Sequence, residues 1–310
     1  MHIFTDLDKF NVIKPVITVG IFDGVHKGHD KIIKTLVDNA KKLNTESVIF
    51  TFWPHPQHVI NGHNKEIKLL NTIDEKIELL EKAGIDHLII YPFTKEFSKL
   101  SSKEFVEQFL VNKLKINTLI VGYDNHIGNN KEGNYEQLKK LAEIYNFNLV
   151  RVAEQKKDKK NISSTNIRND LISGNIELAN SCLGYNYSVT GKIIEGNKIG
   201  NTIGFPTANI EIAEKYKLLP ADGVYAVEVL INEKTYPGML NKGIRPTLKN
   251  QDNKPSIEIH IIDFGKKIYG EKITVKFIKK LRDEIKFDNI ELLKQQLNKD
   301  KEEVIKLLKQ

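Results

Sequence analysis

The feature that most constrains the fold is a strand joined to a helix by a glycine-rich turn near the start of the chain. The short run Val16–Val19 is typical of a strand buried on both faces of a parallel sheet. From Ile32 to Leu43, apolar residues recur at helical spacing. The turn between them contains three glycines, which let the backbone bend sharply and pass close to a ligand: Gly20, Gly24 and Gly28.

Two histidines, His26 and His29, stand where this turn enters the helix. They are three residues apart, so both rings can point the same way on the first helical turn. The N–H groups and the dipole at a helix N-terminus favour an anion. This arrangement predicts nucleotidyl transfer, in which the histidines donate hydrogen bonds to charge that develops on the α-phosphate and on departing pyrophosphate. The alternative interpretation is a pair of surface histidines at a helix start.

The rest of the first half alternates strands with helices. Two of these helices begin with a capping box, at Thr72–Glu75 and at Ser101–Glu104. Five strands that alternate with helices predict an α/β fold with a doubly wound parallel sheet. Ligands bind such sheets beyond the carboxyl ends of the strands, which is where the two histidines lie. After the first strand, we expect strands at 47–52, 87–91, 118–121 and 148–152.

The pattern changes near Gly184 from helical periodicity to short alternating segments separated by turn residues. Such alternation predicts antiparallel strands and a small β-barrel. Two closing helices are expected, with caps at Asp288 and Asp300. We therefore expect a doubly wound domain at 1–183 and a β-barrel domain with C-terminal helices at 184–310. The expected barrel strands are 187–194, 223–231, 257–262 and 273–278.

A second candidate phosphate site precedes this change, in the stretch Ile-Ser-Ser-Thr-Asn-Ile-Arg. Ser163, Ser164 and Thr165 stand before a predicted helix and offer hydroxyl and N–H groups to a phosphate. Arg168 can bind the same phosphate through two parallel hydrogen bonds. A plain helix N-cap is the alternative interpretation.

The predicted barrel contains its own glycine-rich turn, with Gly200 and Gly204 leading into Phe-Pro-Thr-Ala-Asn. Such a turn exposes N–H groups to phosphate. Thr207 and Asn209 are two apart on a strand-like segment, so a hydroxyl and an amide can share a magnesium–phosphate group.

A further candidate, Glu258, lies on an alternating strand beside His260 and opposite an isoleucine face. A kinase that acts on a primary alcohol benefits from a carboxylate within hydrogen-bond reach of that hydroxyl. The alternative is a solvated strand face. We interpret His260 as a structural neighbour.

These stretches resemble known signatures. Residues 20–29, Gly-x-Phe-Asp-Gly-x-His-x-Gly-His, resemble the nucleotidyltransferase superfamily, and in particular the bacterial bifunctional riboflavin kinase/FAD synthetases. Residues 162–168 are similar to the second phosphate motif of that superfamily. Gly-Phe-Pro-Thr-Ala-Asn at 204–209 is similar to the riboflavin kinase motif, and Gly-Ile-Arg-Pro-Thr at 243–247 and Leu-Arg-Asp-Glu at 281–284 match the same family. The resemblance covers nearly all 310 residues.

The resemblance implies two reactions: riboflavin and ATP give FMN and ADP in the C-terminal half, and FMN and ATP give FAD and pyrophosphate in the N-terminal half. It implies ATP and Mg²⁺ as cosubstrate and cofactor, and flavins as substrates and products. His26, His29 and Glu258 would be catalytic, Arg245 and Arg282 would bind flavin, and Thr207 and Asn209 would hold the metal. Nucleotide contacts would come from Gly20, Phe22, Asp23, Gly28, Asp124, Ser163, Ser164, Thr165, Arg168, Gly200, Gly204, Thr207 and Asn209.

The chain departs from the family pattern at a few positions. Asn125 and Ile127 stand where aromatic residues are common, Asn129 where a basic residue is usual, and Asn201 where arginine is frequent. Because of these departures, an alternative function remains open: the chain is a riboflavin kinase whose N-terminal half has lost or changed the acceptor of its nucleotidyl transfer.

Charge, cysteine content and hydropathy limit the classes of protein to which this chain can belong. The net charge of +7 could indicate nucleic-acid binding, but the lysines are dispersed and no basic stretch alternates with aromatic residues. A nucleic-acid-binding module is therefore the less favoured alternative. The single cysteine, Cys182, excludes an intramolecular disulfide and a cysteine zinc site. With no apolar run of membrane length and no signal-peptide core, we expect a cytoplasmic enzyme of small-molecule substrates, without nucleic acid, membrane or an obligate protein partner.

Overall fold

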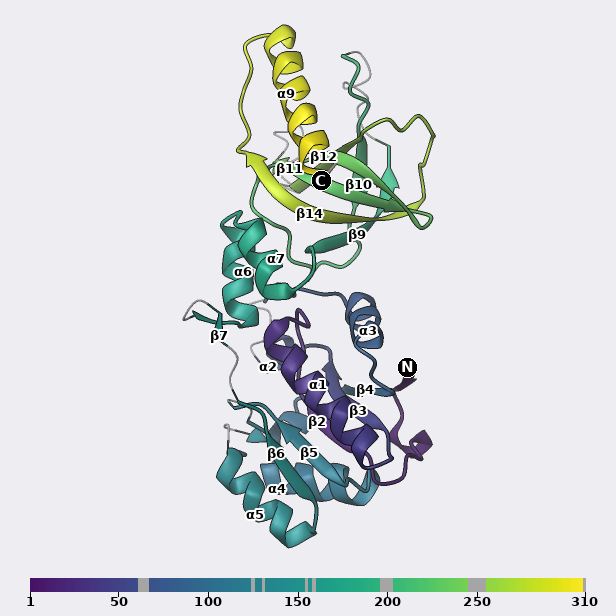
Figure 1. Ribbon diagram of the computed structural model, residues 1–310, viewed down its shortest axis with the longest axis vertical. Helices are drawn as coiled ribbons and strands as arrows, with labels where there is room; N and C mark the ends of the chain where they lie inside the picture. Colours follow the sequence, from purple (N-terminus) through teal and green to yellow (C-terminus); the bar gives the residue numbers. More distant parts are fainter. Residues whose placement is uncertain are drawn as a thin grey trace. The chain divides into compact units, whose positions relative to one another are not determined.

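The computed structural model describes residues 1–60, 67–123, 126–129, 132–153, 156–157, 160–195, 203–244 and 255–308. The chain forms two compact units, Met1–Ser164 and Thr165–Gln310 (Figure 1). The expected fold class is confirmed, with a doubly wound parallel sheet in the first unit and an antiparallel barrel with a C-terminal helix in the second.

Over the described residues, the first unit contains a sheet of six parallel strands in the order β1-β4-β3-β2-β5-β6. The edge strand β1 has three residues and was not predicted, because so short a run shows no periodicity. The strands are β1 (His2–Phe4), β2 (Val16–Val19), β3 (Ser47–Trp53), β4 (His87–Pro92), β5 (Thr118–Val121) and β6 (Asn148–Arg151).

Helices cover both faces of this sheet, because neighbouring residues of a strand point to opposite sides. Val16 packs in a cluster with Leu36 of α1 and Leu80 of α3, whereas Ile17 packs with Leu110 of η4 and Leu138 of α5. The helices are η1 (Leu7–Lys9), α1 (Lys27–Lys42), α2 (Pro56–Ile60), α3 (Ile73–Lys82), η3 (Phe97–Lys99), α4 (Ser102–Phe105), η4 (Val106–Lys113, a π-helix) and α5 (Tyr135–Tyr145). Both expected capping boxes are present.

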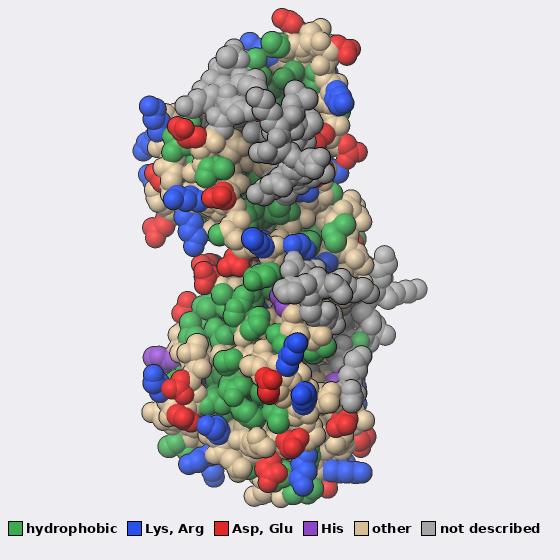
Figure 2. Space-filling model, turned by 180° about the vertical axis from the view of Figure 1, so that it is seen from behind, with side chains coloured by type: hydrophobic (Ala, Val, Ile, Leu, Met, Phe, Trp, Pro, Cys, Tyr) green, Lys and Arg blue, Asp and Glu red, His purple; other side chains and the backbone are tan. Residues whose placement is uncertain are grey.

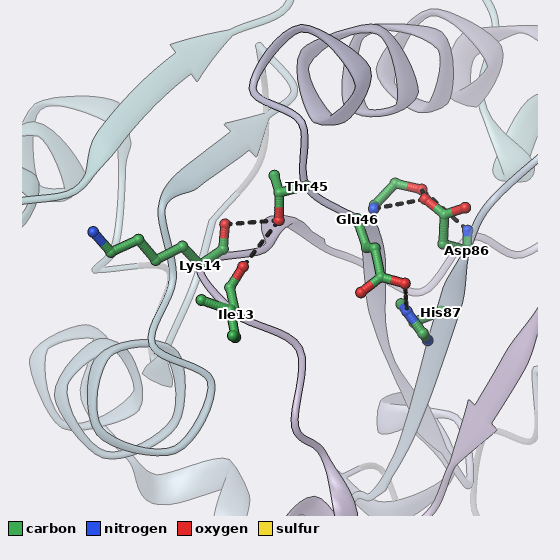
Figure 3. Close-up of polar contacts among 7 residues, drawn as sticks. Ile13, Lys14, Thr45, Glu46, Asp86 and His87 are labelled. Atoms are coloured by element: carbon green, nitrogen blue, oxygen red, sulfur yellow. Dashed lines mark hydrogen bonds and ion pairs between the residues drawn. The ribbon is translucent and has the colours of Figure 1, made fainter.

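Polar contacts hold the amino ends of the central strands (Figure 3). The Thr45 hydroxyl donates to the carbonyls of Ile13 and Lys14 over 3.0 and 3.2 Å. The Nε2 atom of His87 lies 2.9 Å from Oε1 of Glu46. The backbone and hydroxyl of Ser47 also donate to Asp86 Oδ2. These contacts lie at the edge of the sheet opposite the carboxyl ends of the strands.

In the second unit, the described residues include six antiparallel strands that close into a barrel in the order β10-β13-β12-β11-β14-β9. The four expected strands are present, and the strand-like segment after the glycine turn forms β10. The long strand β12 was not predicted, because Pro237 and Gly238 interrupt its pattern. The strands are β9 (Ser188–Ile194), β10 (Ala208–Glu211), β11 (Gly223–Ile231), β12 (Lys234–Ile244), β13 (Pro255–Ile261) and β14 (Lys272–Arg282).

Two short helices, α6 (Ser164–Ile172) and α7 (Ile176–Leu183), precede the barrel and pack on it. The Asn180 amide donates to Phe277 O and accepts from Tyr187 N, both over 2.8 Å. The two compact units divide between Ser164 and Thr165, after the first residue of α6. Near its end, the first unit also has a two-stranded antiparallel ribbon, β7 (Lys156–Lys157) and β8 (Lys160–Asn161).

The expectation of two closing helices is wrong: over residues 255–308 the structure has one C-terminal helix, α9 (Ile290–Leu308). Asn289, and not the expected Asp288, caps its start and accepts from Leu292 N over 2.9 Å. Asp300 lies inside the helix and is 3% exposed. Its carboxylate accepts from Nε and Nη2 of Arg282, at 3.0 and 2.8 Å. The acidic pattern resembled a cap because the sequence alone does not show this partner on β14.

Replacing Asp300 with asparagine is expected to destabilise the barrel by about 1–3 kcal/mol, because the Arg282 guanidinium keeps its place but loses its counter-charge. Urea unfolding followed by circular dichroism measures the change. Glu302→Gln, at an exposed position of the same helix, is the matched control. Trp53, the only tryptophan in the sequence, lies in the first unit. Its fluorescence should therefore report an unchanged unfolding transition of that unit. Equal stability of Asp300→Asn and wild type would contradict this role.

Candidate functional site

The loop between β2 and α1 has an unusual backbone. Phe22, Gly24 and Val25 have φ angles of 52°, 89° and 34°, in the left-handed region that β-branched residues such as valine avoid. A Cβ atom added at Gly20 would lie 2.9 Å from the Phe22 ring. Such strained loops are found at binding sites and persist only where surrounding contacts fix them.

His26 and His29 lie together where this loop enters α1. Their rings stack with centroids 3.7 Å apart and an interplanar angle of 15°. The backbone N–H of His26 donates to Nδ1 of His29 over 3.3 Å, so the ring proton of neutral His29 is on Nε2. Burial, and then the charges of His26 and Lys76, hold the pKa of His29 well below its ordinary value. His29 is therefore a neutral N–H donor.

Asp23 connects the loop to two other segments of the first unit. Its buried carboxylate accepts from the backbone N–H groups of Leu70 and Asn71, at 3.0 and 3.3 Å. Its backbone carbonyl accepts from the Ser164 hydroxyl over 2.8 Å. The structure thus brings Ser164 of the second predicted phosphate motif to Asp23 of the first, although 141 residues separate them in the chain.

Gly28 makes this approach possible, because a Cβ atom there would lie 3.2 Å from the carbonyl oxygen of Ile162 and 3.0 Å from the His26 ring. Ser163 precedes Ser164, which begins α6. Thr165 and Arg168 continue that helix in the second unit, where Thr165 is exposed and Arg168 is half-buried. Asp124 and Asn125 lie outside the described residues.

An apolar pocket of about 380 Å³ borders the loop at Gly20 and Ile21. The sequence analysis missed it, because its aromatic residues come from different strands and helices and meet only in the fold. The Phe52 ring lies 5.5 Å from that of Phe93 and 5.4 Å from that of Phe97. Figure 2 shows hydrophobic side chains gathered on the face of the first unit that it presents. The other lining residues are Val19, Pro56, Ile60, Ser98, Leu100, Phe105, His126, Ile127, Gly128 and Asn129.

In the barrel, the polar candidates lie on neighbouring strands. Asn209 of β10 pairs with Glu258 of β13, which pairs in turn with Asn241 of β12. The hydroxyl of Thr207 donates to Oε2 of Glu258 over 3.4 Å. The structure therefore brings the expected metal donors and the expected catalytic carboxylate side by side.

A cavity of about 420 Å³ opens beside this row and is lined by Thr207, Asn241, Glu258, Arg282 and Glu284, among others. The fork of Arg282 is already bound to Asp300, which fixes its position at the cavity wall. The Asn241 amide donates to Glu284 Oε1 over 3.0 Å. Sequence analysis did not single out Asn241, although it stands two residues before the matched Gly-Ile-Arg-Pro-Thr stretch.

A histidine of β13 contacts the segment that contains Thr207 and fixes its position. Nδ1 of His260 lies 2.8 Å from the carbonyl oxygen of Pro206, and its ring contacts the Phe205 ring edge-on at 5.2 Å. Burial lowers the pKa of His260, so the neutral ring donates to that carbonyl. Gly204 has a φ of 84°, which requires glycine at this turn. Gly200, Asn201 and Arg245 lie outside the described residues.

A second barrel cavity, of about 510 Å³, also contains Thr207. It is lined by Pro206, Phe264, Lys266 and Tyr269, among others, so it combines aromatic rings with basic side chains. Thr207 is thus the residue at which the two barrel cavities meet.

None of the helices in the described part of the chain is long and apolar enough to cross a membrane. The FAD synthetase family model matches residues 10–166, and the riboflavin kinase family model matches residues 183–308. Bifunctional riboflavin kinase/FMN adenylyltransferases from Listeria monocytogenes and Bacillus subtilis are 40% and 37% identical to this chain. These matches cover 96% and 97% of this chain and 93% and 94% of theirs.

A solved structure described as a macrolide-efflux protein from Streptococcus pneumoniae has a TM-score of 0.89 and 29% identity, over 97% of both chains. Both halves of the present fold are therefore found together in a solved structure. The two family matches cover successive parts of the sequence, and the curated relatives are matched over most of their length. The chain therefore belongs to the bifunctional riboflavin kinase/FMN adenylyltransferase family, with the adenylyltransferase first and the kinase second.

Proposed function

We propose that FMN is adenylylated at the loop between β2 and α1, with His26 and His29 as the catalytic residues. The stacked histidine pair, with the proton of His29 fixed on Nε2, is the observation that carries this proposal. Hydrogen bonds from the two imidazoles stabilise charge on the α-phosphate and on the departing pyrophosphate. Gly20, Phe22, Asp23, Gly28, Asp124, Ser163, Ser164, Thr165 and Arg168 contribute the nucleotide contacts.

The flavin ring of FMN occupies the apolar pocket beside this loop. The pocket offers a cluster of phenylalanine rings and borders the loop at Gly20 and Ile21. Aromatic side chains favour a flat ring system. Ile127 and Asn129, at positions where relatives often have other residues, line this pocket, so the flavin contacts differ in detail from the family pattern.

Riboflavin phosphorylation takes place in the barrel, with Glu258 as the base that accepts the proton of the ribityl hydroxyl. Riboflavin occupies the cavity with Arg282, and ATP occupies the cavity with Lys266 and Tyr269. Because Thr207 lines both cavities, the γ-phosphate and the hydroxyl meet beside it. Arg245, Gly200 and Gly204 complete the flavin and nucleotide contacts.

Thr207 and Asn209 fit a magnesium ion, because hydroxyl and amide oxygens are hard donors of the kind that Mg²⁺ accepts together with phosphate oxygens. Bound Mg²⁺ neutralises charge on the ATP phosphates. The carboxylate of Glu258, 3.4 Å from the Thr207 hydroxyl, stays available as a base while the hydroxyl and the amide hold the metal.

The functional halves are 1–183 and 184–310, and the enzyme works on small molecules in the cytoplasm, without nucleic acid, membrane or an obligate protein partner. The similarity of nearly the whole chain to the bifunctional relatives supports this assignment.

A product assay tests both reactions. Riboflavin with ATP and Mg²⁺ should give FMN and then FAD, and supplied FMN should give FAD alone. Chelation of Mg²⁺ should abolish FMN formation, and adding Mg²⁺ back should restore it. FMN formation without any FAD from supplied FMN would favour a kinase with an altered N-terminal half. Tight binding of single-stranded RNA in a filter assay, with neither flavin product, would favour the nucleic-acid alternative.

A further inference from the structure

Lys76 is a buried lysine that the proposed reaction does not yet use. It lies on α3 one turn before Leu80, so it occupies the core-facing side of the helix, and it is 4% exposed. Lysine is almost never fully buried, because its ammonium group is normally kept in water. A cation near a helix N-terminus is also unfavourable for the helix. The stability of α3 therefore does not explain why a lysine occupies this buried position.

The ammonium group of Lys76 contacts the strained loop directly. Its Nζ atom donates to the carbonyl oxygen of Ile21 over 2.7 Å. The same oxygen accepts from the Thr51 hydroxyl over 3.2 Å. Ile21 comes immediately before Phe22, the first residue of the left-handed stretch. Two donors from different elements therefore fix the carbonyl at which the unusual backbone begins.

The titratable groups that interact with Lys76 come from the loop and from α1. Burial lowers the pKa of Lys76 to about 8, and the nearby charge of Asp23 opposes this shift by favouring the charged lysine. Lys76 in turn contributes to the lowered pKa of His29. At neutral pH the lysine is largely charged and His29 is neutral. As pH rises through about 8, the lysine loses its proton.

We propose that Lys76 is a positioning residue of the adenylyltransferase: its ammonium group holds the Ile21 carbonyl, and so the loop before the two histidines. The proposal rests on the catalytic role proposed above for the histidines. Lys76 acts through the loop and through His29, and it needs no contact with the substrate.

The test uses the full-length enzyme, in which the kinase serves as an internal control. Lys76→Met keeps the length of the side chain but removes the donor and the charge. FAD formation from FMN should fall about 10- to 100-fold, mainly in kcat, because misplaced groups lose this much. FMN formation from riboflavin should stay within about twofold, since positioning effects are local. Lys82→Met, on the exposed side of the same helix, should leave both rates unchanged.

Two further readouts separate this role from a merely structural one. In wild type, kcat for FAD formation should fall as pH rises through about 8, relative to FMN formation. Lys76→Arg keeps the charge at these pH values and should remove that fall. In Lys76→Met, the ring of His29 should titrate at higher pH in an NMR experiment, because a repelling charge is gone.

Wild-type FAD formation in folded Lys76→Met would overturn the proposal. If that variant does not fold, Lys76→Arg decides, because an alkaline fall that persists in it would also overturn the proposal. The NMR titration distinguishes this failure from failure of the proposed histidine chemistry. If His29→Ala were fully active while the His29 titration still moved in Lys76→Met, the histidines would lack their catalytic role although Lys76 acts on them as described.

Discussion

Replacing His29 with alanine is expected to lower FAD formation from FMN and ATP by about 100-fold or more, as loss of a donor to developing charge does. The structure gives the physical reason: Nδ1 of His29 accepts from the backbone of its neighbour, which leaves Nε2–H as the donor. His26→Ala should have a similar effect, because it removes the second ring of the stacked pair. Steady-state measurement of FAD formation checks both variants.

This prediction has two controls, the kinase reaction of the same variants and a histidine variant away from the site. FMN formation from riboflavin should be unchanged in both variants, since the kinase site is in the barrel. His2→Ala is the matched control, because His2 is an exposed histidine at the amino end of the same sheet, where β1 pairs with the start of β4. The assignment fails if FAD formation survives in both His26→Ala and His29→Ala.

Replacing Glu258 with glutamine is expected to lower kcat for FMN formation by roughly 10²–10⁴-fold at any magnesium concentration. Glutamine keeps the size of the side chain and can still accept the Thr207 hydroxyl, so the strand pairing and the cavity remain. It cannot accept the proton of the ribityl hydroxyl. FAD formation from supplied FMN should not change.

Asn209→Ala should behave differently, although Asn209 pairs with Glu258 on the neighbouring strand. Loss of a metal donor weakens magnesium binding, so added magnesium should partly restore the kinase rate by mass action. The matched control for Glu258→Gln is Glu228→Gln. Glu228 lies on β11 and lines neither of the two barrel cavities. If added magnesium restored the kinase rate of Glu258→Gln, Glu258 would be a metal ligand and not the base. If Glu258→Gln made FMN at the wild-type rate, Glu258 would be only a solvated residue of the strand.

Local sequence predicted those parts of the fold in which neighbouring residues decide the structure. The strand Val16–Val19 has the predicted bounds, and Thr72 caps α3 with Glu75 as expected. The candidate phosphate residues could be proposed from the sequence because each motif is a continuous stretch, such as Gly20–His29 or Ile162–Arg168.

What the sequence did not show depends on partners far apart in the chain. Asp300 resembles a cap until β14 brings Arg282 to it. The phenylalanine pocket forms only when the ends of β3 and β4 meet the segment around Phe97. Lys76 resembles an ordinary helix lysine, and only the burial of α3 against the histidine loop reveals its contact with Ile21.

The contacts at the amino ends of β3 and β4 give protein engineers a place to work. Thr45, Glu46, Asp86 and His87 hold that edge of the sheet, away from the loop and the pocket. Stabilising changes often reduce activity when they stiffen a strained catalytic loop. Stabilising substitutions near this edge that keep these four contacts can therefore raise the heat resistance of a biocatalyst for FAD manufacture without altering the loop between β2 and α1.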